Sequence, residues 1–186
     1  MAHRLISDND FLATALDLFR TYGFEGVSLK RLADATGLEK ASLYYRYPGG
    51  KDDIALAVAG DAFAWLQANV FEPLAGTGPT RKRVSFVAER LREFYSGGSR
   101  ACVTDVLSIP GGSGKLQLVL RAAMQAWVNA FTQIAKESGM ATATARSRAE
   151  EAIVRIQGSL VLARVLGDTT AFERALRLLP DLLTAE

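Results

Sequence analysis

Cysteine and histidine are almost absent from this sequence of 186 residues, which contains one of each, Cys102 and His3. A single cysteine cannot form an internal disulfide framework, and it fits a reducing compartment. One histidine and one cysteine cannot build a zinc site of the usual type, and a Ser-His-Asp triad would depend on that terminal histidine. We therefore expect no metal, no cofactor and no enzymatic activity.

The sequence also lacks a strong charge imbalance and a long apolar run. It has 22 basic and 20 acidic residues, a formal net charge of +2, so the charge of the whole chain says little about partners. No apolar segment typical of a signal peptide begins the chain, and no run approaches the roughly 20 apolar residues that span a membrane. We expect a soluble, cytoplasmic protein of one domain or two small ones, with a hydrophobic content of 49% that is ample for a core.

The segment 28–51, SLKRLADATGLEKASLYYRYPGGK, has the pattern of two short helices joined by a tight turn. Ser28 is a good N-cap for the first helix, and Leu29 and Leu32 follow at the spacing of one helical face. Gly37 can adopt the positive φ that ends a helix. Positions 28–47 are therefore predicted to be a helix-turn-helix motif.

The second of these helices is predicted to present an unusual outward face. That face carries Lys40, Ala41, Ser42, Tyr44, Tyr45 and Arg46. Segment 28–51 contains five cations and two acids, and 5 − 2 gives a local charge of +3. Cations and hydroxyls can hold phosphates and read base edges, as expected of a helix that lies in the major groove. The alternative is a plain helical hairpin within an all-α core.

Residues 11–58 resemble the DNA-binding domain of the tetracycline-repressor (TetR) family. The resemblance is carried by ALDLF and YG before the motif, LADATGL at the turn, LYYRYP through the second helix and KDDI after it. It implies a homodimeric transcriptional regulator, usually a repressor, whose variable C-terminal domain binds a small-molecule inducer. The sequence departs from the family pattern at two places. Glu39 replaces the usual Ser or Thr cap, and the hinge 47–51 is one residue longer than the commonest spacing.

We assign the predicted DNA contacts by their place in the motif. Base or near-base contacts are expected from Lys40, Ala41 and Ser42, phosphate contacts from Ser28, Tyr44, Tyr45, Arg46 and Lys51, and a further contact from Lys30. Lys51 begins the next helix, where backbone N–H groups also favour an anion. The alternative for Lys51 is an ordinary surface lysine at a helix start.

Helical periodicity extends through the remaining chain and predicts an all-α fold. A first helix is expected to begin near Ser7 and to stop at Gly23. Later helices are expected over 51–73, 80–95, 101–109, 116–138, 143–167 and 170–184. The loop 110–115 ends in Gly-Lys, but Ile109 and Leu116 occupy places where a Walker A loop needs Gly and Ser or Thr. We divide the chain into a DNA-binding domain, 1–52, and an effector-binding and dimerisation domain, 53–186.

The last two helices carry more apolar surface than one core needs, which suggests a symmetric four-helix interface between two chains. The residues predicted for it are Ile153, Ile156, Gly158, Leu160, Val161, Phe172, Leu176 and Leu179. The alternative is a larger monomeric core.

A cavity between helices could hold a moderately apolar effector. Its predicted lining is Trp65, Phe86, Phe94, Cys102, Met124, Trp127 and Phe131, and ordinary core packing is the alternative for each residue.

The sequence therefore predicts a DNA-binding regulator that acts as a homodimer. Two recognition helices about 34 Å apart would read successive major-groove faces of a palindromic operator. An enzyme is the first rival, and it lacks an evident acid–base or nucleophile set. An all-α module that uses the same motif for protein contacts is the second.

Overall fold

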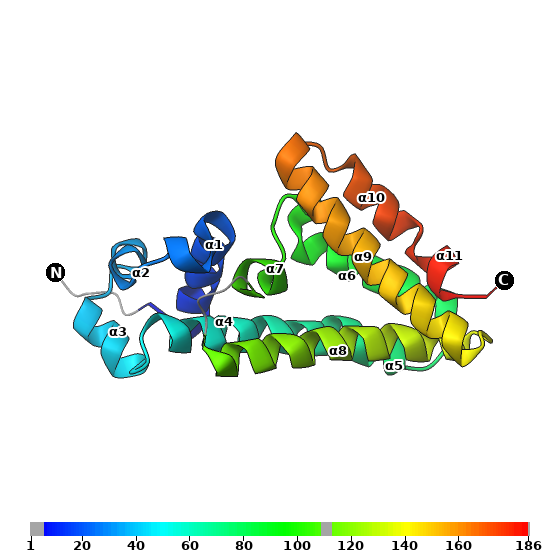
Figure 1. The fold of residues 1–186 in the computed structure, drawn as a ribbon, viewed down its shortest axis with the longest axis horizontal. Coiled ribbons are helices and arrows are strands. Elements are labelled where there is room, and N and C mark those ends of the chain that lie inside the picture. The colour runs from blue at the N-terminus through cyan, green and yellow to red at the C-terminus, as the bar shows by residue number, and fades with distance from the viewer. Residues whose placement is uncertain (1–5, 109–112, 186) are drawn as a thin grey trace. The chain divides into compact units, whose positions relative to one another are not determined.

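The computed structural model describes residues 6–108 and 113–185, and every regular element among them is helical (Figure 1). The predicted all-α fold is confirmed. Internal contacts divide the chain into two compact units. The first unit contains the described residues up to Phe63 together with those of 103–121, and the second contains 64–102 and the described residues from 122 onward. The functional boundary between residues 52 and 53 stays a prediction.

Four complete helices and parts of two others build the first unit. They are α1 (Asp8–Gly26), α2 (Leu29–Thr36), α3 (Lys40–Arg46), the beginning of α4 (Lys51–Leu66), α7 (Val103–Ser108) and the beginning of α8 (Gly114–Glu137). Ser7 caps α1, because its Oγ accepts a hydrogen bond from the Asp10 amide at 3.1 Å. Gly23 interrupts α1 with a φ of 69°, so the predicted stop is a kink followed by one more turn.

The core of the first unit is built around the apolar face of α1. Phe11, Ala15 and Phe19 recur along this face and are fully buried. Phe24 follows the kink and stacks its ring on Phe19, with 6.1 Å between ring centroids. Helix α7 packs against α1. The helix predicted over 101–109 is confirmed for Val103–Ser108, the two residues before it are not helical, and Ile109 lies outside the described residues.

The second unit contains the other helices. They are the end of α4, a π-helical turn η1 (Gln67–Phe71), α5 (Glu72–Ala75), α6 (Thr80–Phe94), a 3₁₀ turn η2 (Ser96–Gly98), the remainder of α8, α9 (Thr142–Leu166), α10 (Thr170–Arg177) and α11 (Leu179–Leu183). Two expectations are corrected. The helix predicted over 51–73 changes to π-helical hydrogen bonding at Gln67, and the helix predicted over 170–184 breaks at Leu178. Pro180 explains the second break, since it lacks an N–H and is favoured in the first turn of a new helix.

Helices α6, α9, α10 and α11 pack against one another in the second unit. Phe172 of α10 is fully buried, and its ring lies edge-on to Tyr95 at 5.8 Å between centroids. Gly98 lies directly against Phe172 with a φ of +97°, and a Cβ at this position would be 2.8 Å from the ring. Arg92 donates to Glu173 at 2.9 Å, which joins α6 to α10 at the rim of this core.

One helical stretch among the described residues, Lys51–Ala75, is long and apolar enough to cross a membrane by length and composition. This corrects the expectation that no apolar run approaches the length that spans a membrane. Its most apolar window has a mean hydropathy of 1.4, and 44% of that window is buried inside the structure. The buried helix of a protein core passes the same test, so the finding is weak evidence for membrane insertion.

Candidate DNA-binding site

The two helices of the predicted motif are present, and their ends have the expected chemistry. Ser28 caps α2, and its Oγ accepts a hydrogen bond from the Arg31 amide at 3.2 Å. Gly37 ends α2 in the left-handed conformation, with φ 71° and ψ 13°. Glu39 is the N-cap of α3 and makes no capping hydrogen bond with its side chain. The helix-turn-helix therefore forms without the cap that α3 would receive from Ser or Thr.

Helix α3 has one buried side and one broad exposed side. Leu43 is fully buried and fixes the helix on the core of the first unit. Tyr44 and Tyr45 are 54% and 89% exposed, although large apolar rings are usually covered. Lys40, Ala41 and Ser42 are exposed as well. The exposed side of α3 therefore carries one cation, two phenols, one hydroxyl and one small residue.

Arg46 lies at the edge of this exposed side and is engaged within the chain. Its guanidinium donates to Asp8 at 3.1 Å, across a separation of 38 residues. The adjacent Tyr47 stacks on Phe11, with 5.3 Å between ring centroids. Burial and, to a smaller degree, the negative charge of Asp8 raise the pKa of the Tyr47 phenol. These contacts join the end of α3 to the beginning of α1.

Lys51 also turns toward its own chain. Its ammonium donates to the Phe24 carbonyl at 3.0 Å, lies 4.2 Å from the centroid of the Phe24 ring and is 3.7 Å from the Glu25 carboxylate. A cation at the first position of a helix is disfavoured by the helix dipole, and Asp52 and Asp53 offset that effect. Lys51 therefore holds the end of α1 against the start of α4.

Two glycines form the hinge before α4. Gly50 has a φ of +65°, and its amide donates to the Tyr47 carbonyl at 2.8 Å. The Gly49 amide donates to the Asp53 carboxylate at 2.6 Å, and a Cβ on Gly49 would lie 2.5 Å from an oxygen of that carboxylate. The longer hinge noted in the sequence is thus closed by a side chain of α4.

Arg31 is a surface cation that the predicted set of contacts did not include. Its guanidinium carbon lies 3.8 Å from the centroid of the half-exposed Tyr22 ring. It also lines a surface hollow of about 510 Å³ at the start of α2, together with Ser28, Lys30, Asp34 and Ala35. The local charge count contained Arg31, but its stacking on Tyr22 depends on the packing of α1 against α2.

Four of the five aromatic residues predicted to line an effector cavity form two packed clusters in the second unit. Trp65 stacks on Phe94 at 4.4 Å between centroids. Trp127 lies edge-on to Phe131 at 5.4 Å and to Phe71 at 6.2 Å. Among the other candidates, the buried Cys102 sulfur accepts a hydrogen bond from the Tyr95 hydroxyl at 3.6 Å, and Met124 is half-buried.

Phe86 departs from the rest of the predicted cavity lining. It lies on α6 and is 52% exposed, whereas the rings of Trp127 and Phe131 are at most 4% exposed. Its assignment to an enclosed cavity is therefore corrected. The neighbouring residues Val84 and Val87 are fully buried and supply the inward face of α6.

Six of the eight residues predicted for the dimer interface are buried in the core of their own chain. They are Ile153, Ile156, Leu160, Phe172, Leu176 and Leu179, each at most 7% exposed. Their assignment is corrected, because such side chains cannot reach a second copy. Helix α9 has two apolar faces, and the sequence pattern does not tell which one α10 covers. Gly158 and Val161 lie on the exposed side, with Val161 at 41% exposure.

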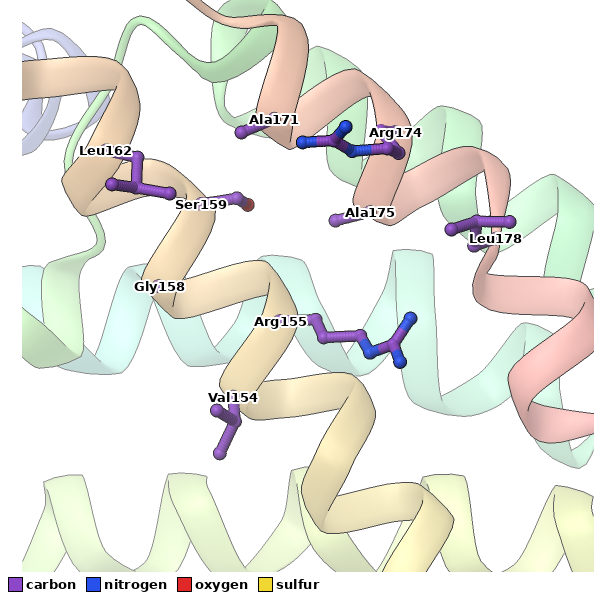
Figure 2. Close-up of a pocket in the computed structure, with 9 residues that line it drawn as sticks. All are labelled: Val154, Arg155, Gly158, Ser159, Leu162, Ala171, Arg174, Ala175 and Leu178. Carbon is purple, nitrogen blue, oxygen red and sulfur yellow. The ribbon is translucent and has the colours of Figure 1, made fainter. Parts of the chain in front are cut away.

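The exposed side of α9 borders a groove against α10 (Figure 2). The groove has a volume of about 350 Å³. Gly158 and Ser159 lie on the α9 side, and Ala171 and Ala175 point from α10 toward them. The large apolar residues exposed on α9 are Val154, Val161, Leu162, Val165 and Leu166, between 41% and 72% exposed. Of these five residues, only Val161 was predicted from the sequence to lie in the interface.

Comparisons with known proteins agree with this geometry. Residues 11–58 match the model of the bacterial regulatory proteins of the tetR family. The chain is 23% identical over 187 residues to the HTH-type transcriptional regulator LmrA of Bacillus subtilis (strain 168), an alignment that covers 95% of this chain and 96% of the relative.

Solved structures show that the likeness of fold extends to both units. A TetR transcriptional regulator from Legionella pneumophila superposes with a TM-score of 0.83 at 19% identity, covering 98% of this chain and 100% of the other. A TetR-family transcriptional regulator from Agrobacterium tumefaciens gives a TM-score of 0.81 at 22% identity, covering 95% and 97% of the two chains.

Proposed function

Since this chain is a transcriptional regulator of the TetR family, we propose that it represses transcription by binding a palindromic operator as a homodimer and leaves the operator when a small molecule binds. This family is a non-enzymatic class, so the enzyme alternative is set aside. The observation that carries the proposal is the exposed side of α3, where Lys40, Tyr44 and Tyr45 surround the small residues Ala41 and Ser42. We place the protein in the cytoplasm, where its DNA is.

The proposed contacts with DNA follow from exposure. Ala41 and Ser42 allow the helix to approach the floor of the major groove, and Lys40 reaches base edges or an adjacent phosphate. Tyr44 and Tyr45 donate their hydroxyls to phosphates on one side of the groove. On α2, the contacts come from Ser28 and Lys30 together with Arg31, which lie around the hollow at the start of that helix.

Arg46 and Lys51 have a different role in this proposal. Each already has a partner within the first unit, Asp8 for Arg46 and the Phe24 carbonyl for Lys51. We assign to them the positioning of α3 and α4 against α1. A phosphate contact through either residue would compete with those partners.

The second copy is proposed to cover the exposed apolar side of α9. Five large apolar side chains on one helix of a water-soluble unit form a patch of the kind that marks an interaction site. A twofold interface places the same patch on both chains, so Val161 and Val165 would face their counterparts and Gly158 would permit close approach. Substitution Val165→Glu should give a monomer, whereas Leu118→Glu, at a 65% exposed position of α8, should leave the dimer intact.

The proposed function is tested by selecting bound duplexes from a random pool at low ionic strength. We expect two inverted half-sites, one helical turn or about 34 Å apart, and a stoichiometry of two chains per duplex. The variant Ser42→Ala should change the preferred base within each half-site, whereas Lys30→Ala should weaken binding to all sequences alike. Recovery of no enriched sequence, or of a single half-site bound by one chain, would contradict the proposal.

A further inference from the structure

A second groove of the second unit lies between the stretch Gln67–Ala75 and the C-terminal half of α8. Its volume is about 520 Å³, within the range of sites that hold drug-sized molecules. The apolar part of its lining consists of Phe71, Leu74 and Ile134, which are 8%, 3% and 1% exposed. None of the aromatic or sulfur-containing residues predicted from the sequence to line an effector cavity lies in this groove.

The polar part of the lining is dominated by hydrogen-bond acceptors. It consists of Gln67, Glu72, Asn129, Gln133 and Glu137, and no lysine or arginine lines the groove. The Gln67 amide donates to the Glu72 carboxylate at 3.5 Å, and the Asn129 amide oxygen accepts a hydrogen bond from Gln125 at 2.9 Å. Two carboxylates and three amides above an apolar surface suit a ligand that has both a positive charge and an apolar body.

Glu137 is already neutralised by a buried partner. It lies in the last turn of α8, where the helix dipole disfavours a carboxylate. Arg83, which is 7% exposed, forms an ion pair with it and donates to the carbonyls of Leu74 and Gly76 at 2.6 Å each. Glu72 has no ion pair among the residues described, so the groove has a net charge of −1 that a monocation would match.

The wall that carries Glu72 is irregular in a way that shapes the groove. The Glu72 amide donates to the Gln67 carbonyl, the i→i−5 bond of a π-turn. Within the same turn, the Asn69 side chain donates to the Trp65 carbonyl at 2.9 Å. Such insertions widen a helix and occur frequently at functional sites. Here the turn contains both Gln67 and Phe71, one polar and one apolar residue of the lining.

We propose that this groove binds an amphipathic organic monocation, whose apolar body lies on Phe71, Leu74 and Ile134 and whose ammonium group pairs with Glu72. The role of this ligand as the effector rests on the proposed function above. Its binding is independent of that function, because the groove lies wholly within the second unit. Trp127 contacts Phe71 edge-on, so its fluorescence reports occupancy of the groove.

The test compares three probes of one shape, 4-phenylbutylamine, 4-phenylbutanol and 4-phenylbutyrate, titrated into the full chain with tryptophan fluorescence as the readout. We expect the amine to bind about threefold more tightly than the alcohol, the effect of one ion pair to the exposed Glu72, and the acid to bind most weakly. Glu72→Gln should remove the preference for the amine and retain weak binding of all three. Asp61→Asn, at an exposed acid on α4 outside the groove, should leave the preference unchanged.

A groove-filling variant identifies the site. Ala75 is exposed and lines the groove, so Ala75→Trp should abolish binding of all three probes while the helical circular dichroism stays native. Equal affinities for amine and alcohol, or an amine preference that survives Glu72→Gln, would overturn the proposal. If the amine binds as expected and leaves operator affinity unchanged, only its role as effector is refuted. If the chain binds no duplex, the proposed function is refuted and the proposed ligand site is not affected.

Discussion

Replacing Lys51 by alanine should destabilise the protein, because the ammonium is bound inside its own chain. Its hydrogen bond to the Phe24 carbonyl involves a charged group, and such bonds contribute about 1.5–3 kcal/mol. The side chain is 25% exposed, which favours the lower end of that range, and the contact with the Phe24 ring adds about 0.5 kcal/mol. Glu25 is 67% exposed and adds almost nothing.

These contributions give a loss of about 2 kcal/mol in the free energy of unfolding for Lys51→Ala. For a chain of this length the loss corresponds to a decrease in Tm of about 4–8 °C. The matched control is Lys40→Ala, since Lys40 is exposed on α3 and has no ion pair among the residues described. Its Tm should stay within about 1 °C of the native value.

In a DNA-binding assay, we expect Lys40→Ala to change the salt dependence of binding and Lys51→Ala to leave it close to native. Each lysine that touches a phosphate contributes about 0.9 to the slope of log K against log salt. A dimer loses two such contacts, so Lys40→Ala should flatten the slope by about 1.8 if that lysine lies on a phosphate. Lys51→Ala should leave the slope of its folded fraction close to native. An unchanged Tm with a slope flattened by about 1.8 would refute the inward role of Lys51.

Three further predictions concern the second unit. Gly98→Ala should reduce the free energy of unfolding by about 3 kcal/mol in urea titration, since the positive φ is strained and the new Cβ meets the Phe172 ring; an effect under about 1 kcal/mol would contradict this packing. Arg83→Met should cost about 3 kcal/mol, because a buried guanidinium with three acceptors is lost; a stability within about 1 kcal/mol of native would show that water replaces it. The Asp168 carboxylate accepts hydrogen bonds from the amide and hydroxyl of Thr170, and these bonds lower its pKa. The stability that these hydrogen bonds contribute should therefore be complete above the unfolded pKa near 4 and should be lost as the pH falls through the folded pKa. An NMR titration that gives Asp168 an ordinary pKa would exclude this contribution to stability.

Local chemistry explains why the motif could be predicted from the sequence. Ser28 and Gly37 act on the turns adjacent to them, and Leu43 lies where helical periodicity places it, so none depends on distant packing. The break before α11 also had a local signal, because Pro180 cannot continue a helix without losing a hydrogen bond.

Long-range contacts explain what the sequence did not predict. Lys51 meets Phe24 across 27 residues and Arg46 meets Asp8 across 38, so the charge count could not separate bound cations from free ones. On α9, Ile156 and Val165 are both apolar, and only the position of α10 makes the first buried and the second 72% exposed. The residues of α9 that were predicted for the interface therefore include Ile153, Ile156 and Leu160, which lie on its buried face.

The most direct measurement is the sedimentation of the purified chain at low ionic strength, with and without duplex DNA taken from the region that flanks its coding sequence. We expect a dimer in the absence of DNA and a complex of two chains on one duplex, which added salt dissociates. A single chain that binds neither this duplex nor any other double-stranded probe would contradict it.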